Sequence, residues 1–309
     1  MYESLREHSS GFHLYIFAFD DLSHKILTNL FLQHVTVIPL SDFETAELLQ
    51  VKEGRSKAEY CWTCTPSVIY HVLEKFNVTE CTYLDADLYF YSDPSVLIGE
   101  LDIYKKNVLI TLHRFSFFPR LYEEKRAGKF CVQFMTFRNE ESSLMVLGKW
   151  RSQCIDWCFA RHEDGKFGDQ KYLDEWPEVY DNVHILEHSG GGIAPWNLTD
   201  YSFSVHDNIA TGKIKKTGIS FRVVFFHYQY VKFLYNGDFD IGWYNIPSKA
   251  KSLFYRKYIL KLASLEKSLK EKNPDYFTGI SVFTKGGIKE FVKTILKKGF
   301  GYNILKLSS

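Results

Sequence analysis

The sequence lacks the features that mark several common protein classes. It has no run of about 18 apolar residues, and its opening residues, MYESLREHSS, lack the apolar middle of a signal peptide. We therefore expect no membrane span or export signal, and the default compartment is the cytoplasm. The GxxxxGKS/T and GxGxxG fingerprints are also absent, which argues against a P-loop NTPase and an NAD enzyme.

The chain carries little net charge, +1 in total, but this charge is unevenly distributed. Residues 249–309 contain 14 lysine and arginine residues against 4 acidic ones, which leaves about −9 for the first 248 residues. With 309 residues, 45 % of them hydrophobic, the chain is long enough for a sizeable core. The sequence predicts a folded domain over residues 1–247 and a basic helical extension over residues 248–309.

Six cysteines are present, and four of them form two close pairs, Cys61 with Cys64 and Cys154 with Cys158. Such pairs superficially resemble a four-thiolate zinc site. However, Cys61 and Cys64 fall within a helical pattern, and free cysteine is among the residue types most often buried. We therefore expect these cysteines to pack in the core.

Strand-like and helical segments alternate along the first half of the chain, as in βαβ units. Ser56 is the expected N-cap of a helix over residues 56–76, with Glu59 completing a capping box, although Pro66 favours a kink or a break. Residues 142–162 have a second helical pattern. The expected strands are residues 13–21, 34–40, 81–84, 107–113, 129–138, 183–187 and 222–229. This order, with a more mixed second half, predicts a three-layer α/β domain.

Asp85 and Asp87 stand at the end of one apolar run, in the stretch YLDADLYFYSDP. Side chains alternate in an extended segment, so Leu84 and Ala86 can face the core while both carboxylates share the other side. Two like charges within about 5 Å repel by roughly 1 to 3 kcal/mol, and a bound cation relieves this repulsion. Hard oxygen ligands select Mg²⁺ or Mn²⁺. The alternative is that the aspartates only cap a turn.

Six stretches of the sequence together resemble the GT-A fold glycosyltransferases that use nucleotide-diphosphate sugars. They are EYCWTCTP (59–66), YLDADLYFYSDP (83–94), CVQFMTFRN (131–139), GKFGDQKYLDEWP (165–177), GGGIAPWNL (190–198) and FFHYQ (225–229). The chain is similar to bacterial polysaccharide-type transferases and more distantly to the glycogenin and lipopolysaccharide galactosyltransferase group. This resemblance implies a Rossmann-like α/β/α catalytic domain over residues 1–247, with a mixed sheet, that transfers a hexose from a UDP-type donor, with retention favoured.

The resemblance also implies a metal and phosphate site. Asp85, Asp87 and His227 would hold Mn²⁺ or Mg²⁺ against the donor diphosphate, and Lys232 would meet phosphate oxygens. In the more distant relatives this lysine stands one residue later. From the residues alone, His227 satisfied by backbone groups and Lys232 as solvated surface remain open alternatives.

Further residues are candidates for the sugar and acceptor sides. In similar glycosyltransferases the counterparts of Asp169 and Gln170 face the donor sugar, so the resemblance implies that these two residues are catalytic. Asp169 is also a candidate N-cap of the following helix, and both roles are compatible. Gln133, Trp196 and Asn197 are expected to line the acceptor side, because a tryptophan face suits the apolar side of a sugar ring.

Arg55 and Lys57 precede the helix before the aspartate strand and are candidates for binding the nucleotide or the sugar. As exposed cations with no identified partner, they are equally compatible with plain surface.

The sequence departs from the GT-A pattern at its start. Such domains open with an interior strand whose end contacts the nucleotide base, followed by a helix. Here Met1 falls within the helix-like stretch YESLREHSSGF, so the first strand is missing from the pattern. We expect the chain to bind a donor more weakly than a version extended upstream.

The basic extension alternates lysines with apolar residues, including Phe291, Ile295 and Leu296. This pattern is typical of a helix on an anionic membrane surface, and a peripheral position on the inner face of the plasma membrane would suit a lipid-linked acceptor. A helix packed back onto the domain is the alternative. Nucleic-acid binding is not expected, since this extension is its sole support.

The favoured function is therefore a metal-dependent glycosyltransferase that acts on a glycan or glycolipid acceptor in surface polysaccharide synthesis. A sugar nucleotidyltransferase would carry a glycine-rich loop with arginine or lysine near its start, and no such loop is found. A non-catalytic protein that binds nucleotide sugars remains open because of the missing strand.

Overall fold

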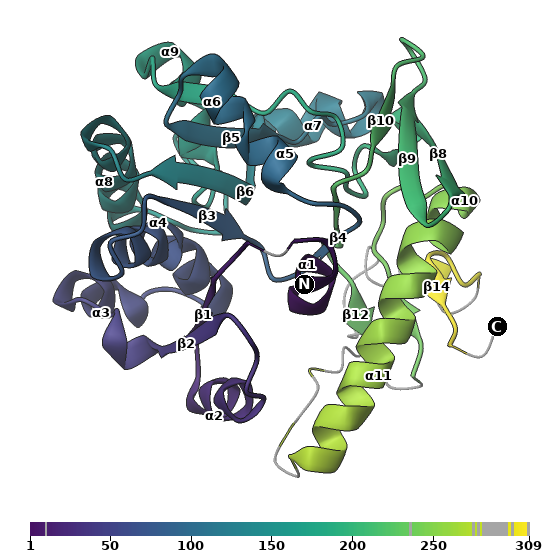
Figure 1. Ribbon diagram of the computed structural model, residues 1–309, viewed down its shortest axis with the longest axis horizontal. Helices are drawn as coiled ribbons and strands as arrows, with labels where there is room; N and C mark the ends of the chain where they lie inside the picture. The colour runs from purple at the N-terminus through teal and green to yellow at the C-terminus, as the bar shows by residue number, and fades with distance from the viewer. Residues whose placement is uncertain are drawn as a thin grey trace.

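The centre of the molecule, seen in a computed structural model, is a four-stranded sheet in the order β3-β6-β5-β7 (Figure 1). The structure describes residues 1–9, 11–234, 237–273, 276, 279, 296–297 and 300–307. β6 runs antiparallel to β3 and β5, whereas β7 is parallel to β5, so the sheet is mixed. The four strands are β3 (Glu80–Leu84), β5 (Val108–Leu112), β6 (Phe130–Arg138) and β7 (Val183–Ile185).

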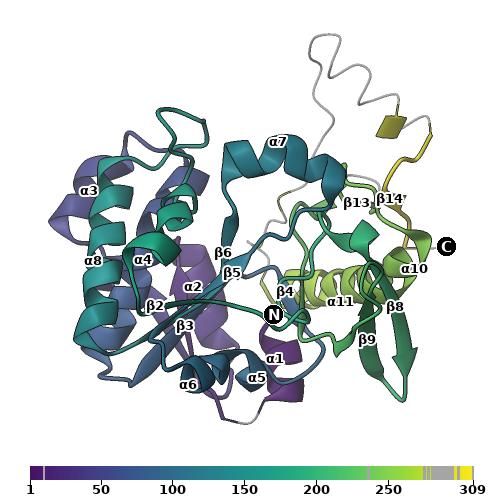
Figure 2. The same ribbon diagram turned by 90° about the horizontal axis from the view of Figure 1, so that it is seen from above.

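Helices cover both faces of this sheet. On one face, α4 (Lys57–Lys75) and α8 (Glu141–Asp156) pack side by side over the largest hydrophobic cluster (Figure 2). The other face carries a second cluster, to which α1 (Tyr2–His8), α5 (Ser95–Ile98) and α6 (Glu100–Tyr104) contribute. The predicted α/β architecture with a mixed sheet is confirmed.

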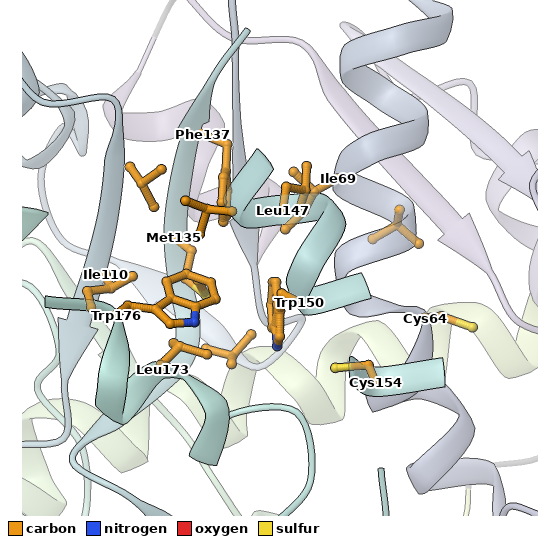
Figure 3. Packing of buried hydrophobic residues seen from close by; sticks show 14 of the residues in the cluster. Cys64, Ile69, Ile110, Met135, Phe137, Leu147, Trp150, Cys154, Leu173 and Trp176 are labelled. Carbon is orange, nitrogen blue, oxygen red and sulfur yellow. The ribbon is translucent and has the colours of Figure 1, made fainter. Parts of the chain in front are cut away.

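The largest cluster is built around aromatic residues and three of the cysteines. Figure 3 shows two of these cysteines, Cys64 and Cys154, together with Trp150 and Trp176. Trp150 of α8 is fully buried and meets the ring of Trp176 edge-on at 5.5 Å between centroids. Cys64 and Cys154 are fully buried in the same cluster, and Cys158 is buried there too, as predicted. Cys61 is exposed instead, because it lies on the outer side of α4.

The start of α4 follows the predicted capping box. The Ser56 hydroxyl accepts a hydrogen bond from the Glu59 N–H, and the Glu59 carboxylate accepts one from the Ser56 N–H. These two bonds satisfy N–H groups that have no partner within the helix. Pro66 lies inside α4 without ending it, so the expected break is not found.

Two strands near the start of the chain stand apart from the central sheet. β1 (Leu14–Ala18) and β2 (Val35–Pro39) pair in parallel, joined by α2 (Asp21–Asn29). Within the described residues no ladder joins β1 to β3. The short helices η1 (Leu40–Asp42) and α3 (Ala46–Lys52) follow β2.

The pairing between β5 and β6 is irregular next to the end of β3. The register shifts between Leu109 and Thr111 of β5, so β6 carries extra residues at this point. Bulges of this kind bend a strand and re-aim its side chains. Here the Gln133 carbonyl of β6 accepts a hydrogen bond of 3.0 Å from the Asp85 N–H, which fixes the first residue after β3.

A late strand returns to the aspartate stretch. β4 (Leu88–Phe90) pairs antiparallel with β11 (Phe225–His227), with His227 opposite Leu88. The Tyr228 N–H also donates to the Asp87 carbonyl at 3.0 Å. This pairing brings His227 beside Asp87, although the two are far apart in the sequence.

The predicted strand over residues 222–229 is divided in the structure. β10 (Ser220–Arg222) joins the antiparallel sheet of β8 (Tyr201–His206) and β9 (Ile209–Ile214), and β11 begins after a break. The chain therefore changes sheets between Arg222 and Phe225.

The remaining helices before the C-terminal region are α7 (Phe117–Ala127), η2 (Lys171–Glu175), α9 (Trp176–Val179) and η3 (Leu198–Asp200).

The C-terminal region begins as a helix that packs into the core. It comprises α10 (Ser248–Ala250), the π-helix η4 (Lys251–Tyr255) and α11 (Arg256–Lys272). Phe254 is fully buried and stacks on Phe226 of β11 at 4.7 Å between centroids, and Tyr258 stacks on Tyr228 at 3.7 Å. Residues 248–272 of the expected basic extension are thus helical and pack against the domain.

The rest of the C-terminal region is described in part. β14 (Ile304–Leu305) adds to β13 (Phe239–Asp240), which also pairs with β12 (Lys232–Phe233). The predicted interfacial helix falls largely outside the described residues, including Phe291 and Ile295. None of the helices in the described ranges is both long and apolar enough to cross a membrane.

Candidate active site

A cavity of about 570 Å³ opens at the carboxyl end of β3. This is the edge of an α/β sheet where ligands ordinarily bind, and the volume suits a small molecule. Four parts of the chain form its walls: the aspartate turn with His227, residues 167–170, α7, and the aromatic residues Trp196 and Tyr244.

Asp85, Asp87 and His227 meet at one side of this cavity. The Nε2 atom of His227 lies 3.1 Å from an Asp87 carboxylate oxygen and 3.6 Å from an Asp85 carboxylate oxygen. One ligand atom from each of the three residues lies within 4.8 Å of the other two. Tyr83 orients Asp85, since its hydroxyl donates to the Asp85 carboxylate at 3.0 Å.

The directions of the pKa shifts indicate that the surroundings of Asp85 and Asp87 favour a positive charge beside them. Burial raises the pKa of Asp85, against the opposing effect of His227. Burial also opposes ionisation of Asp87, but the charge and hydrogen bond of His227 outweigh it and lower the pKa of Asp87. Burial alone would lower the pKa of His227, yet the two carboxylates raise it well above its ordinary value. Two carboxylates thus hold a proton on the imidazole.

This donor set fits a divalent ion. Two carboxylate oxygens and one imidazole nitrogen are ligands that Mn²⁺ and related ions accept, and Mg²⁺ prefers oxygen. A divalent ion would take the place of the proton on His227, since only neutral imidazole can coordinate a metal. Asp85, Asp87 and His227 can therefore hold a divalent metal.

Asp169 and Gln170 line the same cavity. Asp169 is 6 % exposed, and burial raises its pKa to about 7. The Gln170 amide donates to the Ala127 carbonyl of α7 at 2.8 Å, which leaves its side-chain oxygen as an acceptor. The following helix η2 has Gln170 at its N-cap position and no side-chain cap, so Asp169 is not the N-cap.

An aromatic wall adjoins the metal-binding group. The Trp196 ring meets His227 edge-on at 5.4 Å and Tyr244 edge-on at 6.4 Å. Its indole N–H donates to the His113 carbonyl at 2.6 Å, which fixes the ring. His113 is itself buried and lines the cavity, and burial lowers its pKa to about 3, so its imidazole is neutral at neutral pH.

Gln133 and Asn197, the other residues expected on the acceptor side, lie beneath the cavity wall. Asn197 is fully buried, and its amide donates to the His113 and Gly192 carbonyls at 3.0 and 2.9 Å. It holds the glycine-rich stretch to the end of β5. Gln133 is fully buried on β6, and its side-chain polar atoms have no hydrogen-bond partner among the described residues.

The three predicted cationic residues lie outside the cavity lining. The Arg55 guanidinium donates to the Cys158 and Ile155 carbonyls at 2.5 and 2.8 Å, so it ties the end of α8 to α4. Lys57 is an exposed residue in the first turn of α4. Lys232 is exposed on β12, and its ammonium lies 4.4 Å from the Tyr230 ring centroid.

The cavity also contains residues that the sequence did not indicate. Glu123 and Arg126 of α7 line it and form an ion pair, with the Arg126 Nε 3.0 Å from a Glu123 carboxylate oxygen. His113 ends a predicted strand, so the rule that ligands gather at strand ends would have found it. Tyr244 and the α7 pair follow none of the strands expected from the sequence, and no local pattern marks them.

Taken together, the fold and the site define a mixed α/β protein with a carboxylate and histidine group that can bind a divalent metal. No family model matches the chain. The chain is 30 % identical over 285 residues to a protein of Bacillus subtilis (strain 168) described as "Uncharacterized protein YfnD", covering 90 % of this chain and 88 % of that protein. The chain belongs to the family of YfnD.

Two further similarities accompany this one. "Uncharacterized protein YfnF" of the same organism is 29 % identical over 215 residues, covering 67 % of this chain and 70 % of that protein. The apo form of mouse xyloside xylosyltransferase 1 is a solved structure with a TM-score of 0.40 and 17 % identity, covering 60 % of this chain and 77 % of that chain. At that score the likeness is partial, and the assignment of a reaction depends on the site itself.

Proposed function

We propose that this protein is a metal-dependent glycosyltransferase that moves a sugar from a nucleotide-diphosphate donor, of the UDP class, to a glycan or lipid-linked acceptor. The observation that supports this most is the Asp85, Asp87 and His227 group in the wall of a cavity of about 570 Å³. A divalent ion bound there, Mn²⁺ or Mg²⁺, would neutralise the negative charge that grows on the leaving diphosphate. The imidazole ligand favours Mn²⁺.

The protein's own residues would bind and orient the donor sugar. Asp169, with a pKa of about 7, is partly protonated at neutral pH and can donate a hydrogen bond to a sugar hydroxyl. The Gln170 side-chain oxygen can accept one, since its amide nitrogen is already bound to the Ala127 carbonyl. Of the three proposed acceptor residues, Trp196 lies where a sugar ring can touch it, and Gln133 and Asn197 would support it from beneath.

We further propose that the sugar is a hexose and that its anomeric configuration is retained. An inverting enzyme needs a carboxylate base near the acceptor hydroxyl. Glu123 is a cavity carboxylate outside the metal and sugar groups, and its carboxylate is engaged by Arg126. NMR of the product formed from an α-linked donor checks this: an α-linked product supports retention, and a β-linked product contradicts it.

A thermal-shift panel of UDP-, GDP- and dTDP-sugars, with and without Mn²⁺, tests the proposed function. We expect one nucleotide class to raise the Tm, and only when Mn²⁺ is present. Asp85→Asn and Asp87→Asn should abolish this shift while leaving the ligand-free protein folded, because each removes one of two neighbouring like charges. Arg161→Met, which removes a surface charge that pairs with Glu163, serves as a matched control.

The two alternative functions, a sugar nucleotidyltransferase and a non-catalytic binding protein, predict different results in the same thermal-shift assay. A sugar nucleotidyltransferase would be stabilised by a nucleoside triphosphate and a sugar 1-phosphate and would release pyrophosphate. A non-catalytic binding protein would show the Mn²⁺-dependent shift without release of the free nucleotide diphosphate. No shift with any nucleotide would contradict all three functions.

We also propose that the protein works in surface polysaccharide synthesis, bound peripherally to the inner face of the membrane. Two features support this: the basic charge of residues 249–309 and an exposed apolar face on α7 at the cavity rim. This face consists of Phe117, Phe118, Leu121 and Tyr122, which are 58 to 76 % exposed. Replacing Lys285, Lys289, Lys293 and Lys298 with glutamine, while keeping Lys297, should reduce flotation with anionic liposomes. Unchanged flotation would contradict a role of these basic residues in membrane binding.

A further inference from the structure

The loop after β13 forms part of the cavity wall. Tyr244 lines the cavity, and its ring meets Trp196, which in turn meets the proposed metal ligand His227. The position of Tyr244 therefore sets the position of the part of the aromatic wall next to Trp196. This loop lies before the C-terminal region, yet residues from the end of the chain hold it.

Lys297 is the first of these residues. It is 2 % exposed, and its ammonium group lies 2.6 Å from an Asp240 carboxylate oxygen and 2.6 Å from the Gly242 carbonyl oxygen. The same ammonium lies 4.3 Å from the centroid of the Trp243 ring. A buried ammonium is retained only where several acceptors compensate for lost hydration. In the described part of the chain, its partners belong to residues 240–243.

Asn303 holds the same loop from a second direction. Its side-chain amide donates to the Tyr244 carbonyl at 2.8 Å and to the Gly242 carbonyl at 3.2 Å. Its own carbonyl accepts from the Ile241 N–H at 3.0 Å. Asn303 adopts a left-handed conformation, with φ of 53°, which aims its amide at the loop and which asparagine tolerates better than most residues.

The contacts of Lys297 and Asn303 are part of a larger set of bonds between the end of the chain and residues 239–244. The backbone of β14 continues from Asn303 and pairs with β13, with Ile304 opposite Asp240 (Figure 2). The Tyr302 hydroxyl donates to the Trp243 carbonyl at 3.2 Å. The carbonyls of Gly242, Trp243 and Tyr244 thus each receive a hydrogen bond from a side chain near the end of the chain.

We propose that Lys297 and Asn303 are positioning residues of the active site: they fix the loop at residues 240–244 so that Tyr244 and Trp196 present an aromatic face to the sugar ring of a bound sugar nucleotide. This inference rests on the proposed function. Sugar rings pack their apolar faces on aromatic rings, and a small displacement of such a surface costs productive orientation. The end of the C-terminal region is on this account a component of the site.

Three variants test this proposal. Lys297→Met removes both bonds of the ammonium, and Asn303→Gly removes the amide while permitting the left-handed backbone. Lys297→Met combined with Asp240→Asn removes the unpaired buried charge but does not restore the bond to the Gly242 carbonyl. Lys267→Met, an exposed lysine on α11, is the matched control.

The first measurement is hydrogen exchange of the peptide covering residues 239–246 in the full chain without ligand. We expect faster exchange in all three variants and wild-type exchange in Lys267→Met. Unchanged exchange would overturn the proposal, whatever the function proves to be. The double variant separates positioning from stability, because we expect it to regain the Tm while its loop still exchanges fast.

The second measurement compares binding of UDP and Mn²⁺ with release of UDP from UDP-glucose, UDP-galactose and UDP-N-acetylglucosamine. We expect the variants to bind UDP with Mn²⁺ about as tightly as wild type, with kcat/KM for the best sugar nucleotide reduced about tenfold. Parallel loss of UDP affinity would overturn the positioning role, as would unchanged kcat/KM. If wild type fails to bind any UDP compound with Mn²⁺, the proposed function fails, and the exchange experiment still decides whether these residues fix the loop.

Discussion

The two sides of the cavity are built in opposite ways. On the acidic side, Asp85 and Asp87 lie on one short turn after β3, and a single pairing of strands brings His227 to them. On the aromatic side, Trp196 and Tyr244 come from separate loops, and Tyr244 depends on Lys297 and Asn303. The acidic side brings together ligand atoms that can bind a divalent ion, whereas the polar groups behind the aromatic side pair with one another within the protein.

Because of this difference, substitutions on the two sides should have different effects on activity and on stability. Removing a carboxylate from the acidic side relieves repulsion and impairs function without unfolding the protein. Removing Lys297 from behind the aromatic side leaves the Asp240 carboxylate buried without its ammonium partner and destabilises the fold. Variants on the two sides should therefore separate activity from stability.

The largest effect is expected on the acidic side. Asp85→Asn combined with Asp87→Asn should lower turnover by on the order of 10³-fold or more, as for other lost charge-stabilising groups. The Tm of the ligand-free protein should change little, because the variant removes both the repulsion between the carboxylates and their attraction to His227. Kinetics of UDP release together with calorimetric unfolding check this, and a large drop in Tm would mean that the carboxylates are structural.

The next effect is expected behind the aromatic side. Lys297→Met should lower the free energy of unfolding by about 3 to 5 kcal/mol, because it breaks a buried pair with side chains that are 0 and 7 % exposed. Adding Asp240→Asn should recover most of this loss. Urea unfolding of the single and double variants measures it; a loss below about 1 kcal/mol, as for exposed pairs, would contradict the buried pair.

The stability of the protein should depend on pH through Asp169, which lines the same cavity. Its pKa is raised to about 7 by burial, so the folded state binds a proton that the unfolded state has lost above about pH 4. This contribution to stability is complete below the unfolded pKa and declines as the pH rises to 7. Between pH 5 and pH 8 the ligand-free protein should lose about 2 to 3 kcal/mol relative to Asp169→Asn.

Urea unfolding of both proteins across this pH range measures the difference. Equal slopes with pH in wild type and Asp169→Asn would contradict the raised pKa. Arg151→Gln, which removes a partly exposed ion pair with Glu47 far from the cavity, serves as a control, since it should leave the slope unchanged.

The acidic side could be predicted from the sequence because its information is local. Apolar runs ending in polar residues marked β3, and alternation along an extended segment put Asp85 and Asp87 on one side. The α4 cap and the buried Cys64 and Cys154 followed from equally local patterns. His227 was assigned from the resemblance, and pairing of β4 with β11 places it.

The aromatic side could not be predicted in the same way because its contacts join distant parts of the chain. Lys297 belongs to a lysine-rich stretch, and nothing in the sequence marks this lysine as buried. Arg55 is the converse case: it resembles a ligand-binding cation, yet the Cys158 and Ile155 carbonyls occupy its guanidinium. Such assignments depend on tertiary packing, which local periodicity does not encode.

The smallest effect is expected at the α7 wall. Glu123→Gln should change the free energy of unfolding by less than about 1 kcal/mol, because its partner Arg126 is half exposed. If the reaction is retaining, turnover should also change little. Loss of turnover with wild-type binding of UDP and Mn²⁺ would instead identify Glu123 as a catalytic base.

The most direct test of the account is a crystal structure of the full chain with Mn²⁺ and UDP, with the manganese located by its anomalous scattering. The account predicts one strong peak within coordination distance of the Asp85 and Asp87 carboxylates and His227 Nε2, with the UDP phosphates on the same ion. A peak elsewhere, or UDP bound in the cavity with no ion between it and these residues, would contradict it.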